Sequence, residues 1–256
     1  MKPPRAFVVL MAGVHLAALA AVAMPTRGAL CVCLFSVSAV QLAISLGYHR
    51  LISHRAYQAR PWLRLLLAAL AAQSMQGGPI DWATLHRLHH ARSDQEGDPH
   101  SPRFSLWWGH LGWTFGDFPV SGSLKRRYCP DLVDDAGLQW VENHYVSMAL
   151  LVAVTLYLVG GWPWLLWGGP VRVVLNMHAT GMINSVAHRF GYRNHDTADG
   201  SRNHWLVALL TWGEGWHNNH HARPGGASFG SRWWELDTGF LCLQAWQKAG
   251  WAWDIE

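Results

Sequence analysis

The sequence predicts an all-α, polytopic membrane protein in which four transmembrane helices, arranged as two hairpins, carry a helical cap on one side of the bilayer. The first observation is composition: half of the 256 residues are apolar, only 14% are charged and seventeen are tryptophans, as is typical of membrane proteins. The second is that four apolar runs fall in two pairs, each pair divided by a short break. The third is that eight histidines form three short clusters outside those runs.

The first predicted hairpin consists of the runs Ala6 to Met24 and Ala29 to Gly47. Each run approaches the roughly 20 apolar residues that cross the hydrocarbon core, and Pro25-Thr26-Arg27-Gly28 divides them. A cleaved signal peptide is the alternative for the first run, because it follows the basic start Met1-Lys2-Pro3-Pro4-Arg5 and contains the small residues Ala21-Val22-Ala23. The run exceeds the usual apolar region of about 7 to 15 residues, which favours a span.

Basic residues beside the second run predict its orientation. Arg50, Arg55, Arg60 and Arg64 follow it, and lysine or arginine concentrated next to a span marks its cytoplasmic end. The net charge of +4 is modest, and it favours orientation in a bilayer over nucleic-acid binding.

The rest of the chain is predicted to return to the same side. Pro61 to Met75 is apolar but too short to span, so we expect an interfacial or re-entrant helix. The polar, glycine-rich segment from Gln76 to Gln139 forms the cap. A second hairpin follows, Tyr145 to Val159 and Trp162 to Ile183, joined by Gly160-Gly161. Its two crossings place all three histidine clusters on the cytosolic side.

Two ionisable residues, Arg172 and His178, lie inside the fourth span. Such groups are costly in a membrane and usually face a cavity or a partner, so a substrate or structural role is our hypothesis and snorkelling or local pairing the alternative. The short run Trp205 to Leu210 cannot span. Without a repeat or a flexible linker, residues 1–256 are predicted to form a single domain. The four cysteines lack the spacing of a metal site and are expected as reduced thiols.

The spacing of the histidines predicts how their rings point. The second and third clusters have the spacing i, i+3, i+4: His86, His89 and His90, then His217, His220 and His221. On an α-helix the first and last rings are about 40° apart and the middle one points to the other side. Each cluster can therefore offer ligands to two neighbouring metals. The first cluster, His49 and His54, has the spacing i, i+5 and is expected at a helix end where the chain bends.

Metal binding is the favoured interpretation of these clusters. A lone histidine is usually a packed core or interface residue, but many packed imidazoles leave polar nitrogens that need partners. Histidine-rich sites with few carboxylates suit iron, zinc, copper or nickel. Eight imidazoles exceed the three or four ligands of one zinc ion, which indicates two metals and, in this apolar setting, redox chemistry on a lipid.

Four motifs extend the clusters: His49-Arg50-Leu51-Ile52-Ser53-His54-Arg55; His86-Arg87-Leu88-His89-His90 with Ser93-Asp94 and Asp98-Pro99-His100; Asn184-Ser185-Val186-Ala187-His188-Arg189-Phe190-Gly191-Tyr192; and Gly213-Glu214-Gly215-Trp216-His217-Asn218-Asn219-His220-His221. In this order, over nearly the whole chain, they resemble the membrane fatty-acid desaturases of the delta-9 type, the stearoyl desaturase-like family, and in particular its bacterial acyl-lipid branch.

This resemblance implies a di-iron centre that uses O2 as co-substrate. It adds His188 as a ninth histidine ligand and Asn184 as a residue that holds a water on one iron. It implies that one iron is bound by His49, His54, His86, His90 and His221, and the other by His89, His188, His217 and His220. It also implies that Gln76, Trp82 and Thr180 shape the bend of an acyl tunnel, for which ordinary packing is the alternative.

The departures from the family pattern concern substrate and reductant. The acyl-CoA branch typically carries a charged pair before its second cluster, whereas this chain has Thr84 and Leu85. A lipid-linked or carrier-linked acyl chain is therefore favoured. Arg223-Pro224-Gly225-Gly226 lacks the histidine of a cytochrome b5 haem motif, so electrons are expected from a separate ferredoxin, rubredoxin or cytochrome b5-like carrier. An acidic carrier would meet Lys125-Arg126-Arg127, unless this run simply faces the membrane.

We predict that three carboxylates orient the metal-binding histidines and that the remaining histidines are structural. Asp94, Asp98 and Glu214 are candidates to orient metal-bound imidazoles, because a ligating histidine usually donates its other N–H to such a group. Surface or capping carboxylates are the alternative. We interpret the other histidines as structural, at positions 15, 100, 110, 144, 195 and 204.

The predicted function is therefore O2-dependent insertion of a cis double bond, delta-9 by family resemblance, into a saturated acyl chain. The resemblance also implies a multi-pass protein of the bacterial inner membrane with a cytosolic active site. A lipid hydroxylase or other oxygenase on the same scaffold is the nearest alternative. A non-catalytic metal-binding membrane protein, such as a transporter or sensor, is the alternative from another class, and it predicts histidines at different depths along the membrane path.

Overall fold

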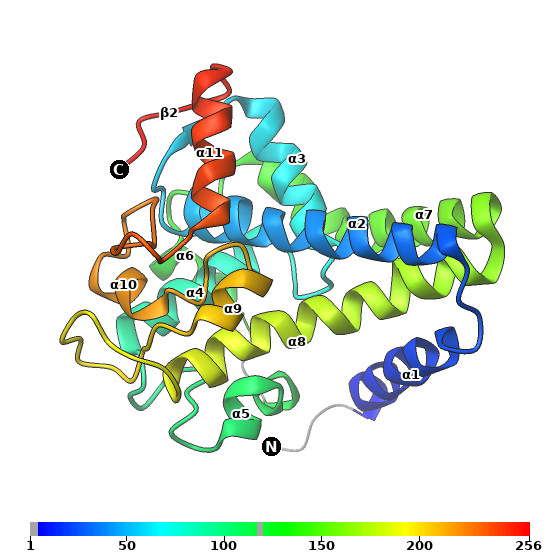
Figure 1. The fold of residues 1–256 in the computed structure, drawn as a ribbon, viewed down its shortest axis with the longest axis horizontal. Coiled ribbons are helices and arrows are strands. Elements are labelled where there is room, and N and C mark those ends of the chain that lie inside the picture. The colour runs from blue at the N-terminus through cyan, green and yellow to red at the C-terminus, as the bar shows by residue number, and fades with distance from the viewer. Residues whose placement is uncertain (1–4, 117–119) are drawn as a thin grey trace.

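A bundle of long helices extends from one side of a cap made of short helices and loops (Figure 1). The computed structural model describes residues 5–116 and 120–256. The basic start at residues 1–4 lies outside them. The fold is mostly helical, as expected. Within the described residues the only sheet pairs two two-residue strands, β1 (Gln58–Ala59) and β2 (Ala252–Trp253), in antiparallel fashion.

The first apolar pair forms α1 (Arg5–Ala21) and α2 (Arg27–Ala43). Thr26 ends the break between them, because its side chain accepts the N–H of Ala29 at 3.1 Å and caps α2. The two helices diverge in Figure 1, and α1 packs mainly against the second pair. α2 continues directly into the π-helix η1 (Ile44–Ser53), so one unbroken helix reaches from the bundle into the cap.

The second apolar pair reverses where the glycines predicted it. α7 (Ala136–Leu166) is broken at Gly161, whose φ of 62° and ψ of −158° are not helical. The chain turns back there and continues through the π-helix η3 (Trp167–Val171) into α8 (Arg172–Ser185). Figure 1 shows the two arms lying along α2.

Two helical stretches are long and apolar enough to cross a membrane, Arg27–Ser53 and Ala136–His188, and the second includes the reversal at Gly161. The apolar helices Phe7–Ala21 and Pro61–Ala72 are shorter. Large apolar side chains point outward along the bundle: Val9 is 70% exposed, Leu34 75% and Leu158 76%. An apolar surface of this extent is typical of a protein that associates with lipid.

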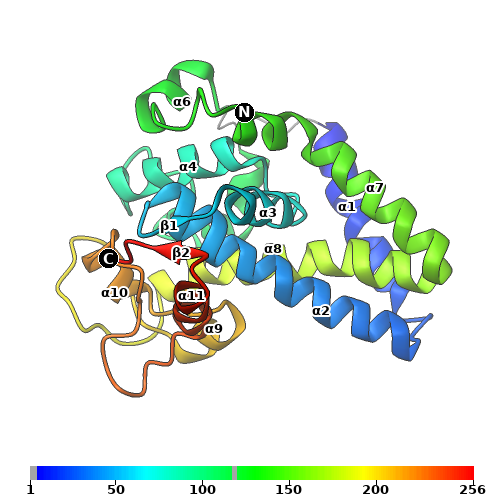
Figure 2. The ribbon, with the colours of Figure 1, turned by 90° about the horizontal axis from the view of Figure 1, so that it is seen from above.

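The cap surrounds the cytosolic end predicted for the bundle (Figure 2). Its helical elements are α3 (Pro61–Ala72), α4 (Pro79–Arg92), α5 (Leu106–His110), η2 (Gly112–Phe115), α6 (Gly122–Tyr128), η4 (Val186–His188), α9 (Trp205–Leu210), α10 (His217–Ala222) and α11 (Thr238–Lys248). The main hydrophobic core lies between η1, α3, α4, α7 and α11, and includes Leu46, Leu67, Ile80, Leu138 and Leu243.

Arg50 has a different role from the one its position suggested. It is fully buried, whereas a residue that marks the cytoplasmic end of a span should reach the surface. Its guanidinium donates to the carbonyl of Ala227 at 3.0 Å and to Asp237 at 3.1 Å, and lies 3.9 Å from the centre of the Phe229 ring. Arg50 therefore ties the first histidine motif to the C-terminal segment. All four cysteines are free, as expected.

Candidate metal centre

The first histidine cluster lies at the end of α2–η1, as predicted, but a π-helix is what aligns it. His49 belongs to η1 and His54 caps it, with the N–H of His54 bonded to the carbonyl of His49 at 3.0 Å. A π-helix closes its hydrogen bonds between residues i and i+5, so residues with this spacing stand above one another. The two ring centres are consequently 4.8 Å apart.

The second cluster is placed by the start of α4. Proline at its first position and Gly78 as the preceding cap begin the helix. Glu142, from α7, accepts the free N–H groups of Ile80 at 2.8 Å and Asp81 at 3.2 Å. A Cβ atom on Gly78 would collide with this carboxylate, so glycine is needed at that position. These contacts fix α4 against α7 and thereby fix the direction of its three histidines.

The third cluster lies on α10, a helix of only six residues. Such a helix is not stable by itself, and the two asparagines between its histidines anchor it. Asn218 accepts the N–H groups of Asn194 and His195, each at 2.8 Å. Asn219 donates to the carbonyl of Phe229 at 2.7 Å and to Glu235 at 2.8 Å. The asparagines face the protein, which leaves the histidines facing α4 and η1.

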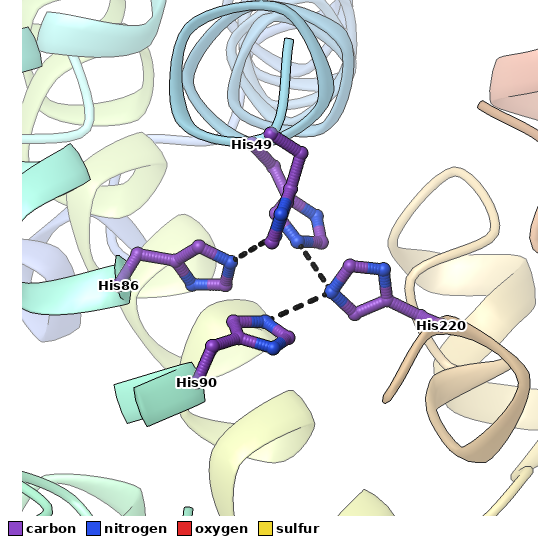
Figure 3. A group of neighbouring side chains, drawn as sticks. His49, His86, His90 and His220 are labelled. Carbon is purple, nitrogen blue, oxygen red and sulfur yellow. Dashed lines mark hydrogen bonds between the residues drawn. The ribbon is translucent and has the colours of Figure 1, made fainter. Parts of the chain in front are cut away.

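Nine imidazoles from four parts of the chain converge into two neighbouring groups, in each of which one ligand atom per residue lies within 4.8 Å of the others. The five-histidine group consists of His49, His54, His86, His90 and His220, and the four-histidine group of His89, His188, His217 and His221. Figure 3 shows four members of the first group pointing toward a common centre. Its Nε2 atoms lie 3.0 Å apart for His49 and His220, and for His220 and His90.

This arrangement corrects one expectation. The family pattern implied that His221 joins His49 and that His220 joins His217, but the structure exchanges the two. His217 and His221 are one turn apart on α10 and their Nε2 atoms lie 3.1 Å from each other. His220 points to the other side, toward His49 and His90. The i, i+4 rule holds in both helices, since His86 and His90 share a group while His89 belongs to the other.

The chemistry of the donor atoms fits metal ions. Burial lowers the pKa values of His86, His89, His90 and His220 well below the usual value, and neighbouring imidazoles lower them further. Neutral rings that donate from Nδ1 present bare Nε2 lone pairs to one another. A metal–imidazole bond of about 2.1 Å puts two ligands at right angles about 3 Å apart, which matches the separations in both groups.

Four carboxylates hold the rings in place at Nδ1, the nitrogen that faces away from the centre of each group. His89 donates from Nδ1 to Asp98 and His188 to Asp94, both at 3.0 Å, and Nδ1 of His49 contacts Glu214. The fourth, Asp199, accepts from Nδ1 of His221 at 2.8 Å. Burial raises the pKa of Asp199, but the hydrogen bond and charge of His221 together with the hydrogen bonds from Ser201 outweigh it, so the net shift of this pKa is downward.

Sequence reasoning missed two of these neighbours. Nothing in the sequence distinguishes Asp199 from Asp196, three residues earlier in the same loop, although the Asp196 side chain is fully exposed. His100, interpreted as structural, is buried with its ring centre 4.3 Å from that of His89. Its motif position, two residues after Asp98, was the available signal.

The residues expected to shape an acyl tunnel meet in one hollow beside the five-histidine group. Its lining comprises Gln76, Trp82, Leu85, His86, His100, Trp113, Thr180 and Asn184. Gln76 donates from Nε2 to the Thr180 hydroxyl at 3.1 Å, and the Trp82 ring stacks on His86 with centres 5.0 Å apart. Asn184, expected to hold a water on one metal, borders the same hollow.

The ionisable residues of the bundle behave differently from each other. His178 pairs locally, because its Nδ1 lies 2.9 Å from Nε2 of His110, whose Nδ1 lies 2.9 Å from the Ser185 hydroxyl. Arg172 is only 5% exposed, so it does not snorkel to the surface, and its Nε has no hydrogen-bond partner in the part of the chain that the structure describes.

The three basic residues of α6 differ in their surroundings. Lys125 pairs with Asp81 at 2.5 Å and with Glu142 at 2.9 Å, and so belongs to the support of α4. Arg126 and Arg127 are exposed. Arg127 lines a surface hollow between α4 and α6 with Leu88, Arg92, Glu96 and Tyr128.

By fold and site, this is a helical, membrane-associated protein whose buried histidine centre is suited to metal ions. The sequence model of the fatty acid desaturase family matches residues 25–254, so the chain belongs to that family and is an oxidoreductase, a fatty acid desaturase. The resemblance found in the motifs is thereby confirmed.

Three relatives indicate the range of known proteins that this chain is similar to. The sn-1 stearoyl-lipid 9-desaturase of Synechocystis is 40% identical over 84% of this chain and 67% of that protein. The sn-2 palmitoyl-lipid 9-desaturase of Nostoc is 41% identical over 82% of this chain and 74% of that protein. An acyl-CoA 5-desaturase of Anemone leveillei is 35% identical over 97% of this chain and 78% of that protein.

Proposed function

We propose that this protein inserts a cis double bond at the delta-9 position of a saturated acyl chain held by a membrane lipid, using O2 and two iron ions. The observation that carries the proposal is the hollow lined by Gln76, Trp82 and Thr180, which opens beside a group of five imidazoles. The names of the cyanobacterial relatives, stearoyl-lipid and palmitoyl-lipid 9-desaturases, support the position of the bond and the lipid-linked substrate.

The two histidine groups would hold one iron each, and Asn184 would orient a water near one of them. Iron at this site supplies, with O2, the oxidising power to remove two hydrogens from adjacent methylenes that no side-chain base can deprotonate. The overall reaction consumes O2, two electrons and two protons and releases two waters. The protein's own contribution is to orient the rings through Asp94, Asp98, Asp199 and Glu214.

The hollow would hold the acyl chain in one register. The hydrogen bond from the Gln76 amide N–H to the Thr180 hydroxyl pairs these two groups with each other, which lowers the cost of an apolar chain passing them. The Trp82 ring, stacked on His86, would press the chain toward the metals. A chain fixed in this way presents one pair of methylenes for reaction, which sets both the position and the geometry of the double bond.

The substrate's carrier is argued from the residues before the second cluster. Thr84 is fully buried and its hydroxyl donates to the carbonyl of Ile80 at 2.7 Å, while Leu85 faces the hollow. Neither residue can hold a charged nucleotide, which supports a lipid-linked acyl chain over acyl-CoA.

The membrane arrangement follows from the apolar exposure of the bundle. α1, α2 and the two arms of the α7–α8 hairpin would make four crossings of a bacterial inner membrane, with the cap in the cytosol. A separate carrier, a ferredoxin, rubredoxin or cytochrome b5-like protein, would deliver electrons. The exposed Arg92, Arg126 and Arg127 support an acidic carrier that docks over the hollow between α4 and α6.

Expression in a host that lacks its own unsaturated fatty acids tests the proposal. We expect new cis-9 monounsaturated chains in the membrane lipids, located by chromatography with double-bond analysis, and none from a His89→Ala variant. Hydroxylated chains without a new olefin would instead identify an oxygenase. One tightly bound zinc per chain and unchanged lipids would identify a non-catalytic metal protein.

A further inference from the structure

We propose that the two metal sites are unequal, and that the four-histidine group binds its ion more tightly than the five-histidine group although it offers fewer imidazoles. This inference rests on the two-metal centre of the proposed function. The cause is the distribution of carboxylates behind the rings: three lie behind the four-histidine group and one behind the five-histidine group.

In the four-histidine group, three of the rings hydrogen-bond through Nδ1 to a carboxylate. His89 contacts Asp98, His188 contacts Asp94 and His221 contacts Asp199, at 2.8 to 3.0 Å. All three carboxylates are at most 11% exposed in their side chains.

The other hydrogen bonds of these carboxylates come from uncharged donors. Asp94 accepts from Ser101 and from the N–H of Gly200, both at 2.7 Å, and Asp199 accepts from the N–H of Ser201 at 2.9 Å. Within residues 5–116 and 120–256, no lysine or arginine forms an ion pair with Asp94, Asp98 or Asp199. Their negative charge is therefore available to the bound ion.

The five-histidine group has one carboxylate, and that one is shared. Glu214 contacts His49, but its other oxygen accepts the Ser45 hydroxyl at 2.5 Å and lies 3.7 Å from the buried guanidinium of Arg50. Nδ1 of His220 is buried without a hydrogen-bond partner among the described residues, as is Nδ1 of His217 in the four-histidine group, so one ring of each group lacks such a partner. The rings of the five-histidine group are thus held mostly by packing, and the cation of Arg50, which pairs more closely with Asp237 at 3.1 Å, offsets only part of the single negative charge on Glu214.

The balance between ligand number and charge decides the order of affinity. A carboxylate behind a ligating imidazole fixes its orientation and raises its basicity, and removing such a partner typically costs about 10 to 100-fold in metal affinity. One additional neutral imidazole does not replace two additional anionic partners near a divalent cation. We therefore expect the dissociation constants of the two sites to differ by at least about 10-fold.

Equilibrium competition tests this with the purified ferrous holoenzyme and a chromogenic Fe2+ chelator at graded concentrations under anaerobic conditions. We expect two classes of iron, one per chain in each class. His54→Ala should remove only the weakly held iron and His188→Ala only the tightly held one. Asp199→Asn should raise the dissociation constant of the tight class by about 10-fold or more and leave the weak class unchanged.

The chain provides a matched control in the same loop. Asp196→Asn changes an exposed carboxylate and should leave both classes unchanged. Asp98→Asn provides a second test at another ring if Asp199→Asn alters the helical circular-dichroism spectrum. Loss of both irons at the same chelator concentration, removal of the tight class by His54→Ala, or equal behaviour of Asp199→Asn and Asp196→Asn would overturn the inference. Lipid analysis is independent: two iron classes without unsaturated product would refute the proposed function alone.

Discussion

Nε2 of His220 lies 3.0 Å from Nε2 of His49, across 171 positions of the sequence, while the adjacent His221 faces a different group. Two neighbours in the chain thus serve two different centres. α4 does the same with His89 and His90. This alternation is the structural basis for the first prediction.

Combining His54→Ala with a substitution on α10 should reveal which histidine belongs to which site. His54→Ala with His220→Ala damages one group twice, so about one iron per chain should remain. His54→Ala with His221→Ala damages both groups, and iron should fall well below one per chain. The measurement is iron content after gel filtration. If the His54→Ala, His221→Ala double variant instead retained more iron than the His54→Ala, His220→Ala variant, His221 would belong to the same group as His54, as the family pattern implied.

The Gln76–Thr180 hydrogen bond should matter for both rate and position of the double bond. Thr180→Val keeps the shape but leaves Gln76 with only a 3.5 Å contact to the Asn176 carbonyl. A lost hydrogen bond of about 0.5 to 1.5 kcal/mol corresponds to a roughly 2- to 12-fold decrease in kcat/KM. We also expect a minor product with a shifted double bond, detected by chromatography. Thr180→Ser retains the hydroxyl and should behave like the parent protein.

Glu142 should be needed to hold α4, and with it the second histidine cluster, in position, although it contacts no histidine. Glu142→Ala leaves the N–H groups of Ile80 and Asp81 without their acceptor at the start of α4. We expect a loss of about 1 to 3 kcal/mol in unfolding free energy, the usual cost of unsatisfied buried groups, together with partial loss of iron. Chemical denaturation and metal analysis measure the two effects. Lys125→Met, which removes the salt bridge but keeps the acceptor, serves as the control, and an equal iron loss there would contradict the capping role.

Asp135 should give the protein an acid-sensitive contact between α3 and α7. Burial raises its pKa, but the hydrogen bond from Arg64 at 2.5 Å and the N–H of Leu138 at 2.8 Å lower it more, so the net shift is downward. Its contribution is therefore present above about pH 4, near the pKa of the unfolded chain, and is lost as the pH falls through the lower folded value.

Thermal unfolding of the parent protein and Asp135→Ala between pH 3 and 7 measures this contribution. The difference should be about 1 to 2 kcal/mol at pH 7, as for other helix caps, and should shrink toward pH 3. Comparing the two proteins at each pH cancels the titration of the histidines. A difference that stays constant over this range would show that the charge of Asp135 does not contribute.

The sequence predicted the ring directions on α4 and α10 because a 3.6-residue period leaves little freedom over one turn. It did not predict the π-helix, since nothing in residues 44–53 distinguishes a closure at i+5 from one at i+4. Asp199 and the burial of Arg50 depend on contacts between segments more than 20 residues apart, which no local pattern contains. Where the family pattern and the helical period disagreed on His220 and His221, the period was right.

Because α4 and α10 each supply histidines to both groups, neither group is geometrically independent. A small rotation of α10 that brings His217 and His221 inward carries His220 outward, and the reverse rotation does the opposite. A substitution that alters the hydrogen bonds of Asn218 and Asn219 would thus improve the geometry of one histidine group at the expense of the other. Adjusting one histidine group alone would require changing one of its histidines or a carboxylate that hydrogen-bonds to it, not the helix that carries them.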